Sequence, residues 1–276
     1  MASILYPPTR PQWVGEVLDS AFRIFRATLL RCLPYSVLAT VAGQIQNVYL
    51  IATGQALHKF GSTDPLWWVL YASGIFLGCA FINAIILRQA AIASGAPSRG
   101  SAALREGLRK APAAIAMIVI LVTLIGLCFL PLLGVPRAYW SWTLVALTAP
   151  VGYVMVLCLC SWPALLVGHK GILGSLRYSA HLVRGNWWRT MMIYLVALIM
   201  IIVLSFTAGL IVGVLAQFAA ARDLAVTTAV SAVMVVASGA IYMPFATSMS
   251  LALYGDLQAR KEGSDLERRI AGASAG

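Results

Sequence analysis

The sequence predicts an all-α fold, a polytopic membrane bundle of six transmembrane helices. Three observations support this: 61% of the 276 residues are hydrophobic, only 11% are charged, and the mean hydropathy is +0.86. Soluble domains average about 25% charged residues, so the composition excludes an ordinary soluble enzyme, a disordered chain and a disulfide scaffold. Lipid offers no hydrogen bonds to the backbone, and helices are therefore the expected form of the apolar stretches.

Six stretches have the roughly 20 apolar residues that a helix needs to cross a bilayer core. They are residues 32–52, 66–87, 112–133, 142–168, 190–216 and 225–254. Gln44, Gln46 and Asn47 interrupt the first stretch, whereas the third, fifth and sixth are almost wholly aliphatic. Pro163 and Pro244 lie late in the fourth and sixth stretches, where each removes a backbone hydrogen bond and predicts a kink.

Basic residues are distributed unevenly between the two sides that these stretches define. The N-terminus, the second and fourth loops and the C-terminus hold 17 of the 20 Lys and Arg residues. Only Lys59, Arg137 and Arg222 fall on the other side. Cytoplasmic loops carry an excess of Lys and Arg, so we expect both termini in the cytoplasm. The net charge of +11 is then a topology signal, and no nucleic-acid partner is expected.

Pairs of basic residues recur before the first, third and fifth stretches. They are Arg26 with Arg31, Arg105 with Lys110, and Arg184 with Arg189. Successive pairs are 79 residues apart, and a fixed spacing suggests copies of one structural unit. The predicted unit is an amphipathic interfacial helix, a span out and a span back. The units would cover about residues 13–94, 98–168 and 172–255 of a membrane domain at 1–255, before a charged cytoplasmic tail at 256–276.

The three amphipathic helices are predicted from helical periodicity at residues 13–30, 101–111 and 172–184. Val17 and Ala21, for example, would belong to the apolar face of the first, and Leu104 and Leu108 to that of the second. Such helices lie at a membrane surface with their basic face toward the headgroups. They either anchor the bundle or bind anionic lipids. The candidate headgroup ligands are Arg23, Arg26, Arg31, Arg105, Lys110, Arg184, Arg189, Trp187 and Trp188.

Neutral polar residues inside the stretches leave a second possibility open. Asp, Glu, Lys and His are absent from the deep parts of the predicted spans, which disfavours proton-driven transport. Gln44, Asn47 and Asn83 could pair across two helices or line a narrow polar path. The alternative function is therefore a permease or channel for a small molecule.

Recognisable catalytic patterns are absent from the sequence. It contains no Walker loop, no G-x-S-x-G, no H-E-x-x-H and no carboxylate pair in a plausible cleft. The five cysteines include no C-x-x-C and form no zinc-type cluster with histidine, so they are interpreted as packing residues. We expect a non-enzymatic protein without a metal site or cofactor, and an enzyme acting on lipid is the least favoured hypothesis.

Two segments resemble a bacterial inner-membrane family. They are SLRYSAHLVRGNWWR at residues 175–189 and LALYGDLQARKEGSDLERRI at residues 251–270. They are similar to the six-helix membrane domain of some glycerophosphodiester phosphodiesterases and to YciC-like uncharacterised bacterial inner-membrane proteins. The resemblance implies the fold and the bacterial cytoplasmic membrane, with membrane lipids and a membrane protein as expected partners. It implies no hydrolysis, because the chain has no soluble region long enough for the catalytic barrel.

Overall fold

The computed structural model describes residues 5–8, 10–53, 64–97, 99–220 and 224–274, and this part of the chain contains helices and no strand. The helices are α1 (Val14–Ala52), α2 (Pro65–Ala93), α3 (Gly100–Cys128), α4 (Trp140–Cys158), α5 (Ser161–Leu166), α6 (Ile172–Val183), α7 (Trp187–Ala220) and α8 (Leu224–Ser274), with short 3-10 turns η1 (Leu130–Gly134) and η2 (Arg137–Tyr139). Six helical segments of this described part are long and apolar enough to cross a membrane. The predicted all-α fold with six spans is confirmed, and it is compatible with a multi-pass membrane protein.

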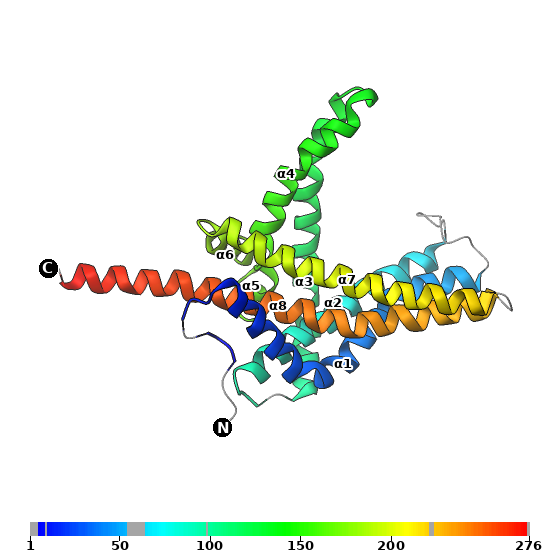
Figure 1. Cartoon of the computed structure of the whole chain (residues 1–276), viewed down its shortest axis with the longest axis horizontal. Coiled ribbons are helices and arrows are strands. Elements are labelled where there is room, and N and C mark those ends of the chain that lie inside the picture. Colours follow the sequence, from blue (N-terminus) through cyan, green and yellow to red (C-terminus); the bar gives the residue numbers. More distant parts are fainter. Residues whose placement is uncertain (1–4, 9, 54–63, 98, 221–223, 275–276) are drawn as a thin grey trace.

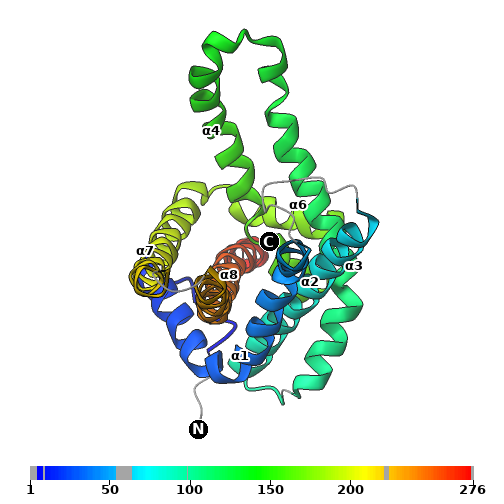
Figure 2. The same ribbon diagram turned by 90° about the vertical axis from the view of Figure 1, so that its right-hand side faces the viewer.

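Four long helices form the main body of the molecule. The helices α1, α2, α7 and α8 extend roughly along its long axis (Figure 1), and Figure 2 views them from one end. Helix α1 packs against α2 and α8, and α7 packs against α8. The N-terminal strap, defined here as residues 5–8 and 10–13, lies where α2 ends and α7 begins. We call this the strap end of the body.

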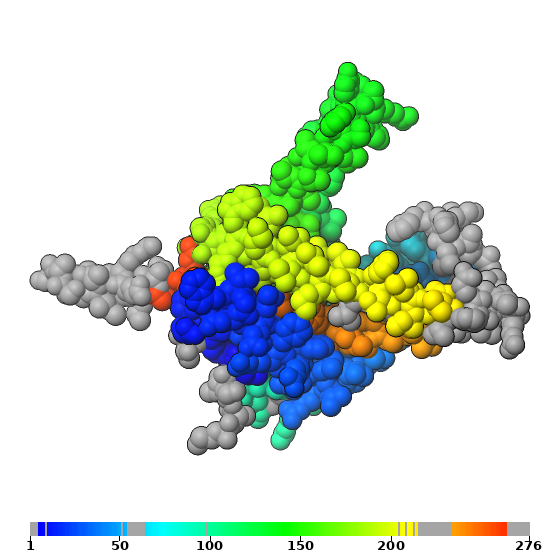
Figure 3. Space-filling view, viewed as in Figure 1, coloured from blue at the N-terminus to red at the C-terminus, as the bar shows by residue number. Residues whose placement is uncertain are grey.

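The hairpin of α3 and α4 projects from the body. Figure 3 shows it as an arm that stands away from the remaining helices. The buried residues of α3 end at Met117, and α4 buries only Leu147 and Val156 among its side chains. Beyond the base of the hairpin, most of its apolar side chains therefore lie on the surface of the protein.

The start of α1 packs on protein. Val17, Ala21 and Ile24 are buried on one face of the helix, as the amphipathic pattern predicts for the first two. Phe25 lies edge-on to Phe245 of α8, with ring centroids 5.7 Å apart. The apolar face of this segment is thus covered by α8.

The three predicted amphipathic segments connect differently to the spans that follow them. The first two continue into α1 and α3 without a break, although Pro34 and Pro112 lie inside these helices. Helix α1 changes direction within its length (Figure 2), as expected for an internal proline. The third segment is a separate helix, α6, because Gly185 takes a positive φ of 89° that ends it before α7. The threefold repeat stays a prediction.

The packed face of α3 differs from the predicted one. Leu108 is 38% exposed, whereas Gly107 and Ala111 are buried. A Cβ at position 107 would lie 2.6 Å from the carbonyl oxygen of Ala80, so a glycine allows α3 to approach α2 closely. Small residues therefore determine this close approach of α3 to α2.

The two prolines of the fourth and sixth spans have different effects. The fourth span is interrupted between α4 and α5, just before Pro163. There the Ser179 hydroxyl of α6 donates to the Leu157 carbonyl and accepts from the Cys160 N–H. Helix α8 continues through Pro244, which cannot donate to the Ala240 carbonyl. The Ser36 hydroxyl of α1 donates to that carbonyl instead, at 2.9 Å.

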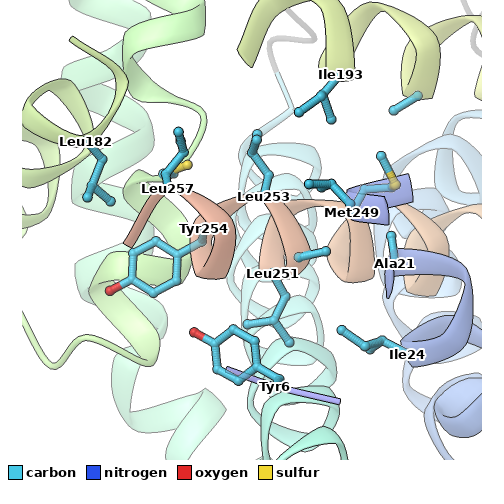
Figure 4. Packing of buried hydrophobic residues seen from close by; sticks show 14 of the residues in the cluster. Tyr6, Ala21, Ile24, Leu182, Ile193, Met249, Leu251, Leu253, Tyr254 and Leu257 are labelled. Atoms are coloured by element: carbon cyan, nitrogen blue, oxygen red, sulfur yellow. The ribbon is translucent and has the colours of Figure 1, made fainter. Parts of the chain in front are cut away.

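The largest buried cluster lies toward the strap end. Figure 4 shows part of it around α8, where Leu251, Leu253 and Leu257 contact residues of α1, α6 and α7. Tyr6 of the strap also belongs to this cluster. The core therefore joins the beginning of the chain to its last helix.

Candidate functional site at the strap end

A buried carboxylate organises the strap end. Asp256 of α8 is fully buried, and its carboxylate accepts from the Gln12 N–H at 2.7 Å. Arg189 and Arg260 each lie 3.2 Å from the same carboxylate oxygen. Both guanidinium groups also donate to the Gln12 carbonyl. One acid, two arginines and a backbone amide thus connect the strap to α7 and α8.

This network lies at the predicted boundary between the membrane domain and the tail. Asp256 and Arg260 were predicted to belong to a charged tail beginning at residue 256, but Asp256 is part of the core. The reason is that Arg189 of α7 and the strap lie across α8 at this point. The sequence signal is an acid that directly follows an apolar run, Leu251–Gly255, and only the fold supplies its partners.

The strap is also held by its backbone. The N–H groups of Leu5 and Tyr6 both donate to the Ala93 carbonyl at the end of α2, at 2.8 and 3.1 Å. Tyr6 is buried against α8, next to Gly255. The strap is therefore a fixed part of the described fold.

The candidate headgroup residues separate into two groups. One group is exposed and comprises Arg23, Arg26, Arg31, Arg105, Arg184 and Trp188. The other group is bound within the protein and comprises Lys110, Trp187 and Arg189. Lys110 donates to the Leu166 carbonyl at 3.0 Å, and Arg189 binds Asp256. The guanidinium of Arg189 is thus part of the buried network.

A hollow of about 630 Å³ lies at the start of α3, and three arginines line it. We call it the arginine hollow and define it by Arg99, Arg105 and Arg109. Glu106 also lines it and lies 2.8 Å from Arg109. Arg99 and Arg109 were absent from the predicted headgroup ligands. Their signal in the sequence was the high basic count of the loop before the third span.

Hydrogen bonds join two of the predicted polar-path residues to each other but not to the third, Asn83. Asn47 donates to Gln44 within α1, at 2.8 Å. Asn83 is fully buried, donates to the Gly107 carbonyl at 3.2 Å and accepts from the Trp162 indole at 2.8 Å. Asn83 thus connects α2 to α3 and α5, and the permease alternative gains no support from these bonds.

The described residues contain no group of three or more His, Cys, Asp or Glu side chains that could hold a metal ion. Comparison of the chain with protein-family models, with curated proteins and with solved structures finds no match. The functional argument therefore depends on the chemistry of the surfaces described above.

Proposed function

We propose that this chain is a non-enzymatic integral membrane protein of the bacterial cytoplasmic membrane that binds anionic lipid headgroups on its cytoplasmic side. The arginine hollow is the observation on which the proposal depends. Arginine recognises phosphate groups through two parallel hydrogen bonds, and Arg105 and Arg109 are both exposed. Each basic residue near an anionic surface contributes roughly 1 kcal/mol.

The distribution of charge supports the same side for the termini and the hollow. Arg99, Arg105 and Arg109 belong to the loop region that shares the basic side with both termini. In a bacterial membrane this side would face the cytoplasm. The resemblance of residues 175–189 and 251–270 to a six-helix inner-membrane family is consistent with that location. Reporter fusions at the two termini test it, and opposite locations of the termini would contradict the topology.

Lipid retention tests the hollow itself. Wild type would be compared with an Arg99→Gln, Arg105→Gln, Arg109→Gln triple variant in nanodiscs containing phosphatidylglycerol and phosphatidylcholine. After extraction into mild detergent, mass spectrometry would measure the retained lipid. We expect the triple variant to retain several-fold less phosphatidylglycerol, because it lacks the three cationic ligands.

The matched control removes the same charge elsewhere on the proposed cytoplasmic side. An Arg26→Gln, Arg31→Gln, Arg184→Gln variant changes three exposed arginines outside the hollow. It is expected to retain more phosphatidylglycerol than the hollow variant. Equal retention by wild type and the hollow variant would contradict the proposed site.

A further inference from the structure

A second cavity at the strap end has a different chemical character from the arginine hollow. It measures about 320 Å³ and lies between the strap, the residues that follow α5, and α8. Tyr6 and Pro8 line it from the strap, and Tyr254, Gln258 and Glu262 line it from α8. Its volume is at the lower end of the roughly 300–1,000 Å³ typical of small-molecule sites.

Two largely buried tyrosines line this cavity, and their hydroxyl groups have no hydrogen-bond partner in the part of the protein that the structure describes. Tyr6 is 6% exposed and Tyr254 is 2% exposed. Figure 4 shows the two hydroxyls on the same side of the cluster. Neither oxygen is among the fully buried side-chain atoms that lack a partner, so both donors are reachable from the cavity, where a ligand can accept from them.

Glycines keep the space around these tyrosines open. A Cβ at position 168 would lie 2.8 Å from the Tyr254 hydroxyl oxygen. A Cβ at position 255 would lie 2.8 Å from both the Tyr6 ring and Pro8. Real Cβ atoms do not come this close, so a larger residue at either position would displace a wall of the cavity.

The charged side chain that lines the cavity is negative, although the chain as a whole is basic. Among the described residues that line it, Glu262 carries the only charge, although the net charge of the chain is +11. The Glu262 carboxylate accepts from Gln258 Nε2 at 2.8 Å and from the Tyr178 hydroxyl at 3.5 Å. A cation is therefore the complementary ligand.

The neighbouring aromatic cluster already holds an ammonium group. Lys170 Nζ lies 3.9 Å from the centroid of the Tyr178 ring, and that ring lies 6.3 Å from the Tyr254 ring. Tyrosine faces attract ammonium ions through the ring quadrupole. A phenol is already protonated at neutral pH, and burial and the nearby Tyr254 raise the pKa of Tyr6 further, so its hydroxyl is a donor there.

We propose that this cavity binds an amino alcohol, either free or as the headgroup of a lipid. The Glu262 carboxylate pairs with the ligand's ammonium group, and the hydroxyls of Tyr6 and Tyr254 donate to its oxygen. The ligand thus gives both hydroxyl donors an acceptor and compensates the charge of the carboxylate. The inference is independent of the proposed binding of anionic lipids, because it uses different residues and a ligand of opposite charge.

Calorimetry of the purified full chain in detergent tests the free ligand, with ethanolamine as the probe and ethylamine as the analogue without the oxygen. We expect wild type to bind ethanolamine saturably and more tightly than ethylamine. Glu262→Gln should weaken ethanolamine binding about tenfold, since a charged hydrogen bond is lost. Asp19→Asn, at an exposed carboxylate outside the cavity and the strap, should leave binding unchanged.

Substitution of Tyr254 distinguishes a role in ligand binding from a role in stability alone. Tyr254→Phe removes a hydroxyl without a partner among the described residues, so the empty protein should melt at the same temperature as wild type. The same variant should lose the preference for ethanolamine over ethylamine. A large loss of stability without ligand, or an unchanged preference, would contradict the proposal.

Nanodiscs distinguish the two sources of the amino alcohol. If the source is a lipid, wild type will retain phosphatidylethanolamine on extraction, and Glu262→Gln will not. If the source is a free molecule, ethanolamine will bind in calorimetry without such retention. The proposal is overturned if wild type binds neither probe, or if Glu262→Gln binds both as wild type does. The Arg99→Gln, Arg105→Gln, Arg109→Gln variant separates the two proposals. If it loses phosphatidylglycerol and still binds ethanolamine, only the arginine hollow is affected.

Discussion

The strap end and the α3–α4 hairpin are held in place by different means. At the strap end, Asp256 is fully buried, and its partners come from the strap, α7 and α8. On the hairpin, Val122 is 62% exposed, Leu133 85% and Trp142 76%. Both regions consist of apolar helices, yet one is fixed by protein contacts and the other presents an apolar surface that lipid would cover. Hydrophobicity alone therefore does not distinguish a core from a lipid-facing surface.

The most damaging change should be at the buried acid. Asp256→Ala leaves Arg189 and Arg260 without their carboxylate, and breaking a buried ion pair in this way costs about 3–5 kcal/mol. Unfolding in mixtures of dodecyl maltoside and sodium dodecyl sulfate, followed by circular dichroism, would measure the loss. Asp19→Ala is the control, because its pair with Arg23 is exposed and contributes less than about 1 kcal/mol. Similar losses in both variants would show that the network is not a centre of stability.

The second test compares the base and the outer part of the hairpin on the same helix. Met117 is fully buried where α3 meets the body, whereas Val122 lies one and a half turns further along. Met117→Ala should cost about 2–5 kcal/mol through the cavity that it leaves. Val122→Ala should change stability by no more than about 0.5 kcal/mol in detergent. If Val122→Ala were as costly as Met117→Ala, the outer hairpin would be packed against protein rather than lipid.

The smallest loss of stability is expected at Ser36, whose hydroxyl bonds the carbonyl that Pro244 of α8 leaves without its usual donor. Ser36→Ala leaves the Ala240 carbonyl without its donor, and an unpaired buried acceptor costs about 1–3 kcal/mol. In a Pro244→Ala background the restored N–H can bond that carbonyl, so the cost of Ser36→Ala should fall. A double-mutant cycle of unfolding free energies measures the difference. Additive effects of the two changes would mean that the serine does not compensate for the proline.

Several parts of the fold could be predicted from the sequence because they depend on local patterns. Hydropathy located the six spans, and helical periodicity placed Val17 and Ala21 on one apolar face of α1, which the structure buries against protein. The packed face of α3 could not be found in this way, because Gly107 and Ala111 pack through their small size rather than their hydrophobicity. Periodicity counts large apolar residues, so it favoured Leu104 and Leu108.

The sites were less predictable because they depend on residues far apart in the sequence. Arg189 was predicted to face lipid headgroups, since neither its partner Asp256 nor Gln12 lies near it in the chain. The pairing of Asn83 with Trp162 similarly connects residues from different spans. Tyr6 and Tyr254 carry no motif at all. Their shared cavity exists only after the two ends of the chain have come together.

The strap also sets an order of events during synthesis. Gln12 leaves the ribosome early, but its partner Asp256 is 244 residues further along the chain. The contact can form only once the last span has been made, whatever the earlier helices have done in the meantime. Contacts over such long separations are slow to form, so closure of the strap marks the completion of assembly rather than its beginning.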